Sequence, residues 1–516
     1  MPEDKTKYRP ICLISVFGKL YENLINMRLQ SEIDEKGGLS NLQFGFRKKR
    51  STVNAVQEMI RIARGGAGKG KPPKWCALIL IDVQNAFNTA SWNLILQKLL
   101  TRGISRYLIN IIAEYFTERY ILIDKGLKKP IGGGVPQGSV LGPTLWNVLY
   151  DDVTKIKLPL GSKPICYADD LAIVITASSK EKLTTKVENS LEEVCRYMKQ
   201  NKLKIANKKT KAILLRSAGN IDDVTFKIEN DRIRPVHTVE YLGFTINKSL
   251  RFKNHIDKAC EKARKTAKAL SALMPNVRGP TENKKKVMCM AIQSVLLYGA
   301  PIWNEAAQKH VYRKKLLSAQ RLTVLRICSA YRTVSTDALL VLAGIVPIHL
   351  MADERNRLFK YNNIDQNTKR MEREETIKKW QQEWDGSSKG VWTRRLIKDV
   401  KCWMSRKWGQ VNYFVTQCLT GHGCYKRYLY KFRRCSTPIC DYCPEIDDAN
   451  HTIFACPRWE RDRVRMNIEI GLEVNAENMT MMMLKSAECW DKIEFYLTKI
   501  MKSKIDEEKN QERRRK

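Results

Sequence analysis

The first half of the chain alternates short apolar runs with longer segments of helical periodicity. Residues 76–81 are uninterrupted apolar side chains that end at Asp82, the pattern of a short buried strand. Two further apolar runs, at residues 164–166 and 171–175, flank the tetrapeptide Tyr167-Ala168-Asp169-Asp170. This arrangement predicts a hairpin with the two acids at its turn.

Helical patterns surround and follow these strands. Residues 91–119 and 180–200 are predicted helices, and short strands are expected over residues 203–246. Residues 251–290 also have helical periodicity, and residues 291–350 are predicted to be packed helices. Strands mixed with helices, then helices alone, predict an α+β protein, and 516 residues are enough for several cores.

Three carboxylates on the predicted strands suggest a metal site. Asp169 and Asp170 are neighbours that repel each other, so the pair is best tolerated where it is solvated or where a cation neutralises it. Asp82 follows a buried strand, a position where active sites concentrate. The three side chains offer the hard oxygen ligands that two Mg²⁺ ions use in phosphoryl transfer. An ordinary acidic surface turn is the alternative for the Tyr-x-Asp-Asp string alone.

Short segments between residues 8 and 243 form an ordered set of motifs. They are Tyr8-Arg9-Pro10-Ile11 with Gly18-Lys19-Leu20 and Glu22, Phe44-Gly45-Phe46-Arg47 with Ser51-Thr52, Asp82 to Phe87, Gly134 to Ser139 with Leu141-Gly142-Pro143, Tyr167 to Asp170, Lys209-Thr210 after Asn201-Lys202-Leu203, and Tyr241-Leu242-Gly243. In this order they resemble the reverse transcriptases of non-LTR (LINE-type) retrotransposons. The segments 330–335 and 421–423 fit the same family, and the chain looks most like arthropod elements with a C-terminal Cys-Cys-His-Cys knuckle.

The resemblance implies a right-hand polymerase fold of fingers, palm and thumb, followed by a helical region and a small zinc knuckle. We therefore expect six regions along the chain. They are fingers at 1–74, palm at 75–250, a helical thumb at 251–350, a helical basic connector at 351–430, the zinc knuckle at 431–470 and a C-terminal helical tail at 471–516.

The same resemblance implies roles for individual residues. Asp82, Asp169 and Asp170 would be the catalytic ligands of two Mg²⁺ ions, and Phe87 would be the gate that excludes a ribose 2′-OH. The expected nucleotide-binding residues are Phe87, Gln137, Gly138, Arg47 and Lys209, and the expected primer-binding residues are Tyr167, Tyr241, Leu242 and Gly243. Asn88 stands where many relatives carry Asp, which leaves open that the chain comes from a retrotransposon copy that is losing its function.

The C-terminal Cys440-x2-Cys443-x7-His451-x4-Cys456 string is a candidate zinc site. Three thiolates and one imidazole suit tetrahedral zinc in a closed structural site. The x7 spacing is longer than in retroviral knuckles and resembles the retrotransposon type. Buried free thiols are the alternative.

Charge indicates the class of partner. The chain has 92 Lys and Arg against 54 Asp and Glu, a formal net charge of +38, which implies a polyanion such as a phosphate backbone. Residues 251–290 are strongly basic and would follow a duplex backbone, unless they are only a solvated helix face. Tryptophans between residues 380 and 408 could stack bases, but we favour core positions. The sequence contains no run of 18 apolar residues, so it predicts no transmembrane helix, and we expect no membrane partner.

We therefore expect an RNA-directed DNA polymerase that uses an RNA template, a DNA primer or target and dNTPs, with two Mg²⁺ ions and one structural Zn²⁺. The resemblance places it in the nucleus at the integration site, and otherwise in the cytoplasm with element RNA. The chain is expected to lack the family's endonuclease domain. A nucleic-acid-binding remnant without turnover is the alternative, and an intron-maturase-like enzyme would have a different thumb and no knuckle.

Overall fold

A computed structural model describes residues 11–65, 75–123, 126–215, 224–275 and 279–515. The chain divides into two compact units, Met1–Phe252 and Lys253–Lys516. Motif residues 8–10 and the basic residue Arg278 lie outside the described residues.

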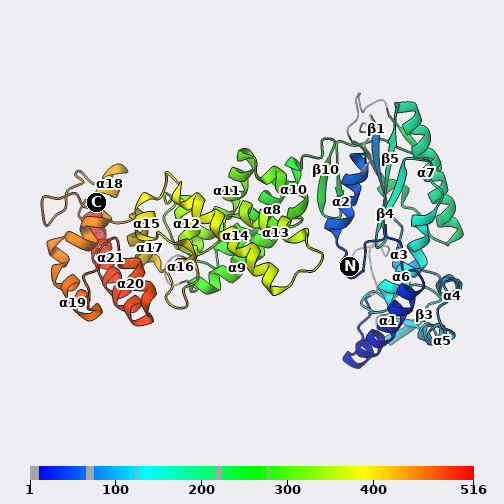
Figure 1. The fold of residues 1–516 in the computed structure, drawn as a ribbon, viewed down its shortest axis with the longest axis horizontal. Helices are drawn as coiled ribbons and strands as arrows, with labels where there is room; N and C mark the ends of the chain where they lie inside the picture. Colours follow the sequence, from blue (N-terminus) through cyan, green and yellow to red (C-terminus); the bar gives the residue numbers. More distant parts are fainter. Residues whose placement is uncertain (1–10, 66–74, 124–125, 216–223, 276–278, 516) are drawn as a thin grey trace. The chain divides into compact units, whose positions relative to one another are not determined.

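A four-stranded antiparallel sheet is the centre of the first unit (Figure 1). Its strand order is β4-β5-β1-β6, with β1 at Trp75–Ile81, β4 at Ser162–Tyr167, β5 at Asp170–Ala177 and β6 at Lys211–Leu215. Ile81 pairs with Leu171, so the ends of β1 and β5 that carry the acids are neighbours. The buried strand and the hairpin predicted from the apolar runs are both present.

Helices cover both sides of this sheet, which explains why consecutive apolar residues in the middle of its strands are buried. Helix α7 (Lys180–Gln200) contacts β1 and β5, and α2 (Thr52–Ala63) contacts β4 and β5. The two helices lie on either side of the sheet in Figure 1. The further helices are α1 (Val16–Glu35), α3 (Ala86–Thr89), α4 (Trp92–Thr101), α5 (Arg106–Tyr115) and α6 (Gly142–Tyr150).

The helices expected over residues 91–119 are α4 and α5. A turn over residues 102–104 separates them. Ser105 then begins α5 as its N-cap, with its hydroxyl accepting a hydrogen bond from the Leu108 amide. Three hairpins complete the unit: β2 (Tyr120–Ile123) with β3 (Leu127–Pro130), β7 (Phe226–Ile228) with β8 (Asp231–Ile233), and β9 (Thr238–Tyr241) with β10 (Phe244–Asn247).

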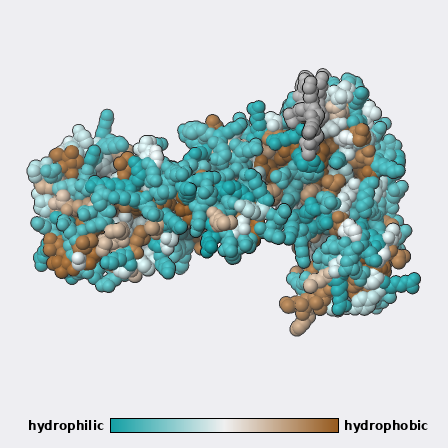
Figure 2. Space-filling view, viewed as in Figure 1, coloured by the Kyte–Doolittle hydropathy of each residue, from teal (hydrophilic) through white to brown (hydrophobic). Residues whose placement is uncertain are grey.

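One side of α1 is unusually apolar and exposed. The α1 apolar face consists of Val16, Phe17, Leu20, Tyr21, Leu24 and Met27. Their exposed fractions run from 53% at Leu24 to 84% at Phe17. Figure 2 shows the hydrophobic colour over this helix. Isolated exposed apolar residues are normal, but a continuous stripe marks a contact surface.

The described part of the second unit is built from helices around one hydrophobic core, which runs from Met274 to Met501. Trp380, Trp384 and Trp403 are buried in it, which confirms their expected core positions. The helices are α8 (Lys253–Ser271), α9 (Glu282–Leu297), α10 (Ala300–Ala307), α11 (His310–Ile327), α12 (Thr336–Ala343), α13 (Ile348–Phe359), α14 (Gln366–Asp385), α15 (Val391–Leu396), α16 (Val400–Met404), α17 (Tyr413–Thr420), α18 (Lys426–Lys431), α19 (Glu460–Ile470), α20 (Met479–Lys485) and α21 (Ala487–Arg515).

Membrane-crossing potential is low among the described helices. None is individually long and apolar enough to span a bilayer. Two sharply bent pairs, α9 with α10 and α12 with α13, reach that length and composition only when taken together.

Candidate active site and metal cluster

Asp82 lies directly after β1, at the edge of the sheet. Its carbonyl oxygen accepts a 2.8 Å hydrogen bond from the Ala206 amide, and the Gln84 amide donates to the Lys204 carbonyl at 2.8 Å. These bonds hold the segment after β1 in place. The half-buried Asp82 side chain lines two pockets, one shared with Asp169 and the other with Asp170. The structure therefore brings the three predicted carboxylates together.

The two adjacent acids belong to a tight turn between β4 and β5. Tyr167 pairs with Asp170, so Ala168 and Asp169 form the turn, with Ala168 at a φ of 58°. Surrounding protein, and then the negative charges of Asp169 and Asp82, raise the pKa of Asp170 to about 6. Mutual repulsion of this kind is what a bound cation would relieve.

A buried glutamine holds this turn, and the sequence analysis did not find it. The Gln43 side-chain oxygen accepts hydrogen bonds from the amides of Gly45 (3.0 Å) and Ala168 (3.2 Å). The Phe44 amide donates to the Cys166 carbonyl at 2.8 Å, so the segment extends along β4. Gln43 immediately precedes the Phe44-Gly45-Phe46-Arg47 motif, which was the available signal.

Phe87 lines a cavity of about 380 Å³ together with Asp82 and Asp169. Its ring stacks on the fully buried Trp146, with 5.3 Å between centroids and 19° between planes. Phe46 meets it edge-on at 6.0 Å. Neighbours on two sides fix the ring at the cavity wall, which is what a steric gate requires. The cavity is of the size that holds a small ligand.

Gln137 and Gly138 line the same cavity. The Gln137 carbonyl accepts a 2.7 Å hydrogen bond from the Cys12 amide. Gly138 has a φ of 102°, and a Cβ there would lie 2.6 Å from the Cys12 carbonyl oxygen. Only glycine fits this close approach of two backbone segments.

Glu22 supports the loop that carries Gln137, from a buried position on α1. Its carboxylate accepts hydrogen bonds from the Ser139 hydroxyl (2.9 Å) and the Val140 amide (2.6 Å). The Ser139 hydroxyl also accepts from the Gly142 amide at 3.1 Å. Glu22 therefore ties α1 to the loop before α6 that carries Gln137.

Lys209 and the β9–β10 hairpin line the second pocket of Asp82. The Lys209 ammonium lies 3.3 Å from an Asp82 carboxylate oxygen and is largely exposed. Tyr241 and Leu242 line this pocket with Asp170, and Gly243 completes the hairpin turn. Tyr241 is buried, so Leu242 and the backbone of the turn are the accessible parts of this motif.

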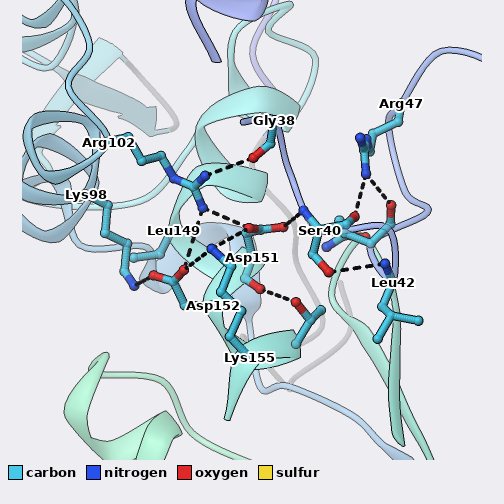
Figure 3. A network of polar contacts seen from close by, with 12 residues as sticks. Gly38, Ser40, Leu42, Arg47, Lys98, Arg102, Leu149, Asp151, Asp152 and Lys155 are labelled. Atoms are coloured by element: carbon cyan, nitrogen blue, oxygen red, sulfur yellow. Dashed lines mark hydrogen bonds and ion pairs between the residues drawn. The ribbon is translucent and has the colours of Figure 1, made fainter. Parts of the chain in front are cut away.

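Arg47, one of the expected nucleotide-binding residues, contacts the backbone of its own loop in this structure. Its guanidinium donates to the carbonyl oxygens of Ser40 (2.6 Å) and Gln43 (3.1 Å), as Figure 3 shows for this loop. Partial burial, and then the charge of Arg50, lower its pKa. In this structure Arg47 holds the loop that carries Gln43, and Gln43 in turn holds the turn of Ala168 and Asp169.

A buried carboxylate anchors the same loop (Figure 3). Asp151, which is fully buried, accepts 2.8 Å hydrogen bonds from the Ser40 amide and from the Arg102 guanidinium. Asp152 pairs with Lys98 at 2.6 Å. These bonds tie the loop to the 3-10 turn Asp151–Lys155 that follows α6.

The C-terminal cysteines and histidine converge. The ligand atoms of Cys440, Cys443, His451 and Cys456 all lie within 4.8 Å of one another. The Cys440 and Cys456 sulfurs are 3.8 Å apart, as expected for two thiolates at about 2.3 Å from tetrahedral zinc, and too far for a disulfide. The Cys443 sulfur lies 3.1 Å from His451 Nε2. The donor set and its spacing therefore fit zinc.

Acidic residues fix the loops that carry these ligands. The His451 amide donates to Asp448 at 3.0 Å, and buried Asp447 accepts from the Thr452 hydroxyl (2.6 Å) and the Lys504 ammonium (2.8 Å). Burial raises the pKa of the Cys456 thiol to about 12. A cation is what would convert these thiols to thiolate ligands near neutral pH.

Comparison with known proteins identifies the class of the first unit. Residues 1–246 match the reverse transcriptase (RNA-dependent DNA polymerase) family. The first unit therefore carries a reverse transcriptase domain, and the resemblance drawn from the motifs is confirmed. The expected α+β fold class is confirmed as well.

The similar curated proteins come from non-LTR retrotransposons. The chain is 26% identical over 480 residues to a putative 115 kDa protein in the type-1 retrotransposable element R1DM of Drosophila melanogaster, covering 88% of this chain and 46% of that protein. It is 25% identical over 486 residues to the Pol polyprotein of element R1 from Bradysia coprophila, covering 89% and 47%. The chain thus spans about half the length of these relatives.

Among solved structures, telomerases match at low TM-scores. Apo telomerase from Candida tropicalis gives a TM-score of 0.32 at 9% identity over 68% of this chain and 60% of that one. Telomerase from Candida albicans with a telomeric RNA fragment gives 0.31 at 11% identity over 68% and 58%.

Proposed function

We propose that this chain is an RNA-directed DNA polymerase of a non-LTR retrotransposon. The observation that carries the proposal is the convergence of Asp82, Asp169 and Asp170 on two pockets that share Asp82. In the reaction, the primer 3′ oxygen bonds to the α-phosphorus of a dNTP and pyrophosphate leaves. The matched reverse transcriptase family supports this chemistry for the first unit.

The three carboxylates would hold two Mg²⁺ ions. These ions would supply charge neutralisation at the attacking and leaving oxygens. The protein's own contribution is to place the carboxylates: Asp82 after β1, and Asp169 and Asp170 on a turn held by Gln43. The raised pKa of Asp170 fits a site that gains from a cation.

The cavity of Phe87, Gln137 and Gly138 would take the incoming dNTP. Phe87, fixed between Trp146 and Phe46, would lie under the sugar and exclude a 2′-OH. Lys209, beside Asp82, would provide a positive charge and a proton for the departing pyrophosphate.

The primer end would lie at Tyr167 and at the β9–β10 turn, Tyr241 to Gly243, which line or adjoin the pocket of Asp170. The template would be RNA, and its duplex with DNA suits the +38 net charge. We propose that this work is done at the chromosomal integration site in the nucleus.

The Cys440, Cys443, His451 and Cys456 cluster would hold one structural Zn²⁺. Its four donors leave no open coordination position, which is the property of a structural site. It would keep the loops of residues 435–456 folded and take no part in nucleotide transfer.

Primer extension on poly(rA)/oligo(dT) tests the polymerase proposal. The wild-type chain should extend the primer with dTTP and Mg²⁺, and Asp169→Asn should reduce the rate by about 100-fold or more, because a charged ligand is lost. Glu192→Gln is the matched control, since this carboxylate is 73% exposed on α7. Absence of extension by the folded wild-type chain would favour a binding remnant, and full activity of Asp169→Asn would refute the site.

A further inference from the structure

Three segments that are distant in sequence meet on the surface of the second unit. They are the loop after α11 that contains Thr333, the turn after α17 that contains His422, and helix α18, which contains Tyr428. The Thr333 hydroxyl lies 2.9 Å from His422 Nδ1 and 2.7 Å from the Tyr428 hydroxyl. The motifs at 330–335 and 421–423 are therefore parts of one site, which the polymerase reaction does not use.

Aromatic rings surround this hydrogen-bonded group. Tyr428 lies with 5.0 Å between ring centroids from both His422 and Phe432, and 6.0 Å from Tyr331. Phe432 is 46% exposed, and Tyr430 is 50% exposed. Large rings that stay open to solvent are available for stacking with a planar ligand.

Cations without a structural partner flank the rings. In the part of the chain that the structure describes, no carboxylate lies within ion-pair distance of Arg332, Lys431 or Arg433, and all three are exposed. Two other cations of α18 are occupied, since Lys426 pairs with Asp441 and Arg427 pairs with Asp448. Helix α18 thus pairs Lys426 and Arg427 with acids of the Cys-His cluster loops, while its last residue, Lys431, has no acidic partner among the described residues.

The His422 imidazole is an uncharged polar group beside the Thr333 and Tyr428 hydroxyls. Burial, and then the nearby positive charge of Lys431, lower its pKa to about 4. The imidazole is therefore uncharged at neutral pH. With the hydroxyls of Thr333 and Tyr428, it offers hydrogen-bonding groups suited to polar, uncharged atoms such as those on base edges.

We infer that Arg332, Thr333, His422, Tyr428, Lys431 and Phe432 form a binding site for single-stranded nucleic acid. This set is named the α18 site here. Exposed rings interleaved with unpaired cations are the combination that stacks bases and neutralises their phosphates. A duplex keeps its bases stacked inside, so the exposed rings favour an unpaired strand.

The α18 site shares no residue with the polymerase cavity proposed above, because its residues lie in the second unit and those of the cavity lie in the first. It would hold a strand without taking part in nucleotide transfer. RNA and DNA share the recognised features, namely base faces and phosphates, so binding of both must be compared.

Photocrosslinking to the full chain tests the location. Oligomers of about 12 nucleotides, a length within the range that one aromatic platform binds, would carry 5-iodouracil. Excess unlabelled blunt-ended RNA–DNA duplex would occupy the polymerase unit without offering a single strand to the α18 site. Crosslinked peptides are expected to include residues 426–434, whereas crosslinks confined to residues 1–252 would overturn the proposal. Ribo- and deoxyribo-oligomers would show which strand is preferred.

Affinity measurements with the same oligomers, by fluorescence anisotropy, test the residues. Phe432→Ala should weaken binding about 5- to 100-fold, because one base loses its stacking partner. Lys431→Ala should reduce the slope of affinity against salt by roughly 0.7. The matched controls are Phe495→Ala, an exposed ring on α21, and Lys401→Ala, an exposed cation on α16.

Equal affinity of Phe432→Ala and Phe495→Ala would overturn the proposal, as would a preference for an acidic peptide such as poly-Glu over the oligomers. Phe432→Ala should unfold at the wild-type temperature and extend a pre-annealed primer at the wild-type rate. If the wild-type chain has no polymerase activity but its binding of oligomers still depends on Phe432, the proposed function is refuted and the α18 site is retained.

Discussion

Gly45 lies directly against Ala168: a Cβ at Gly45 would come within 2.1 Å of the Ala168 amide nitrogen. Ala168 is the residue of the β4–β5 turn with a positive φ, and the Gln43 side chain accepts hydrogen bonds from the amides of both residues. The finger motif therefore sets the position of Asp169 through backbone contact. No side chain larger than hydrogen can occupy position 45 without a backbone shift.

Gly45→Ala should reduce primer extension at least about tenfold by displacing the turn. Gly132→Ala is the matched control, because nothing lies within 4 Å of a Cβ there and its φ is not in the left-handed region. Both variants should keep their far-UV circular dichroism. Unchanged extension by Gly45→Ala would show that the turn adapts without cost to the metal site.

Glu22→Ala should destabilise the first unit by about 1–3 kcal/mol, because the Ser139 hydroxyl and the Val140 amide lose their acceptor inside the protein. Asn23→Ala, the next residue on α1 and an exposed one, should change stability by less than about 0.5 kcal/mol. Urea unfolding of both variants measures the difference. Equal midpoints would mean that the loop before α6 finds other partners.

The raised pKa of Asp170 predicts that the stability of the metal-free protein depends on pH. Its folded pKa of about 6 is above the ordinary value near 4, so the folded state binds more protons than the unfolded state between these two pH values. Stability therefore falls as pH rises through this window, by about 1 kcal/mol after allowance for solvent screening. Asp170→Asn should remove this fall.

Thermal unfolding from pH 4 to pH 7 measures the Asp170 contribution. The wild-type chain should lose stability relative to Asp170→Asn as pH rises, and millimolar Mg²⁺ should reverse the loss. Parallel pH profiles for the two proteins would show that Asp170 has an ordinary pKa.

Phe87→Val should admit ribonucleotides, because it opens the cavity wall that Trp146 and Phe46 otherwise fix. The ratio of dTTP to rUTP incorporation should fall by at least about tenfold, while the rate with dTTP changes less. A ratio equal to that of the wild-type chain would mean that Phe87 only fills the core.

Zinc removal should act on the second unit alone. The purified chain should contain one Zn²⁺, and Cys443→Ser should lose it and lower the unfolding temperature, because metal binding there is part of folding. Cys402→Ser is the matched control, since Cys402 is an exposed free thiol. Extension on a pre-annealed primer should survive both changes. Metal analysis that finds no zinc in the intact protein would refute the site.

The sequence predicted the parts of the site that depend on local pattern. The apolar run before Asp82 and the hairpin around Asp169 are local signals, and the Cys440 to Cys456 spacing is a local motif. The support behind them depends on tertiary contacts. Tyr150-Asp151-Asp152 also places two adjacent acids after a tyrosine, yet Asp151 is buried and pairs with Arg102.

Contacts between distant segments also account for features that the sequence did not predict. Arg47 donates to the carbonyl of Ser40, and Asp151 holds the same loop by accepting a hydrogen bond from the Ser40 amide. No rule of sequence spacing predicts the contact between Ser40 and Asp151. The break between α4 and α5 depends on one turn and one N-cap, which periodicity over residues 91–119 does not resolve.

The α1 apolar face has a practical consequence for handling the protein in solution. The net charge of +38 on the whole chain keeps protein molecules apart at low ionic strength, while the exposed stripe from Val16 to Met27 favours self-association. Concentrated salt screens the repulsion and strengthens apolar contact. The washes that strip bound polyanions during purification should therefore be the ones that precipitate the protein, and a mild non-ionic detergent should prevent this.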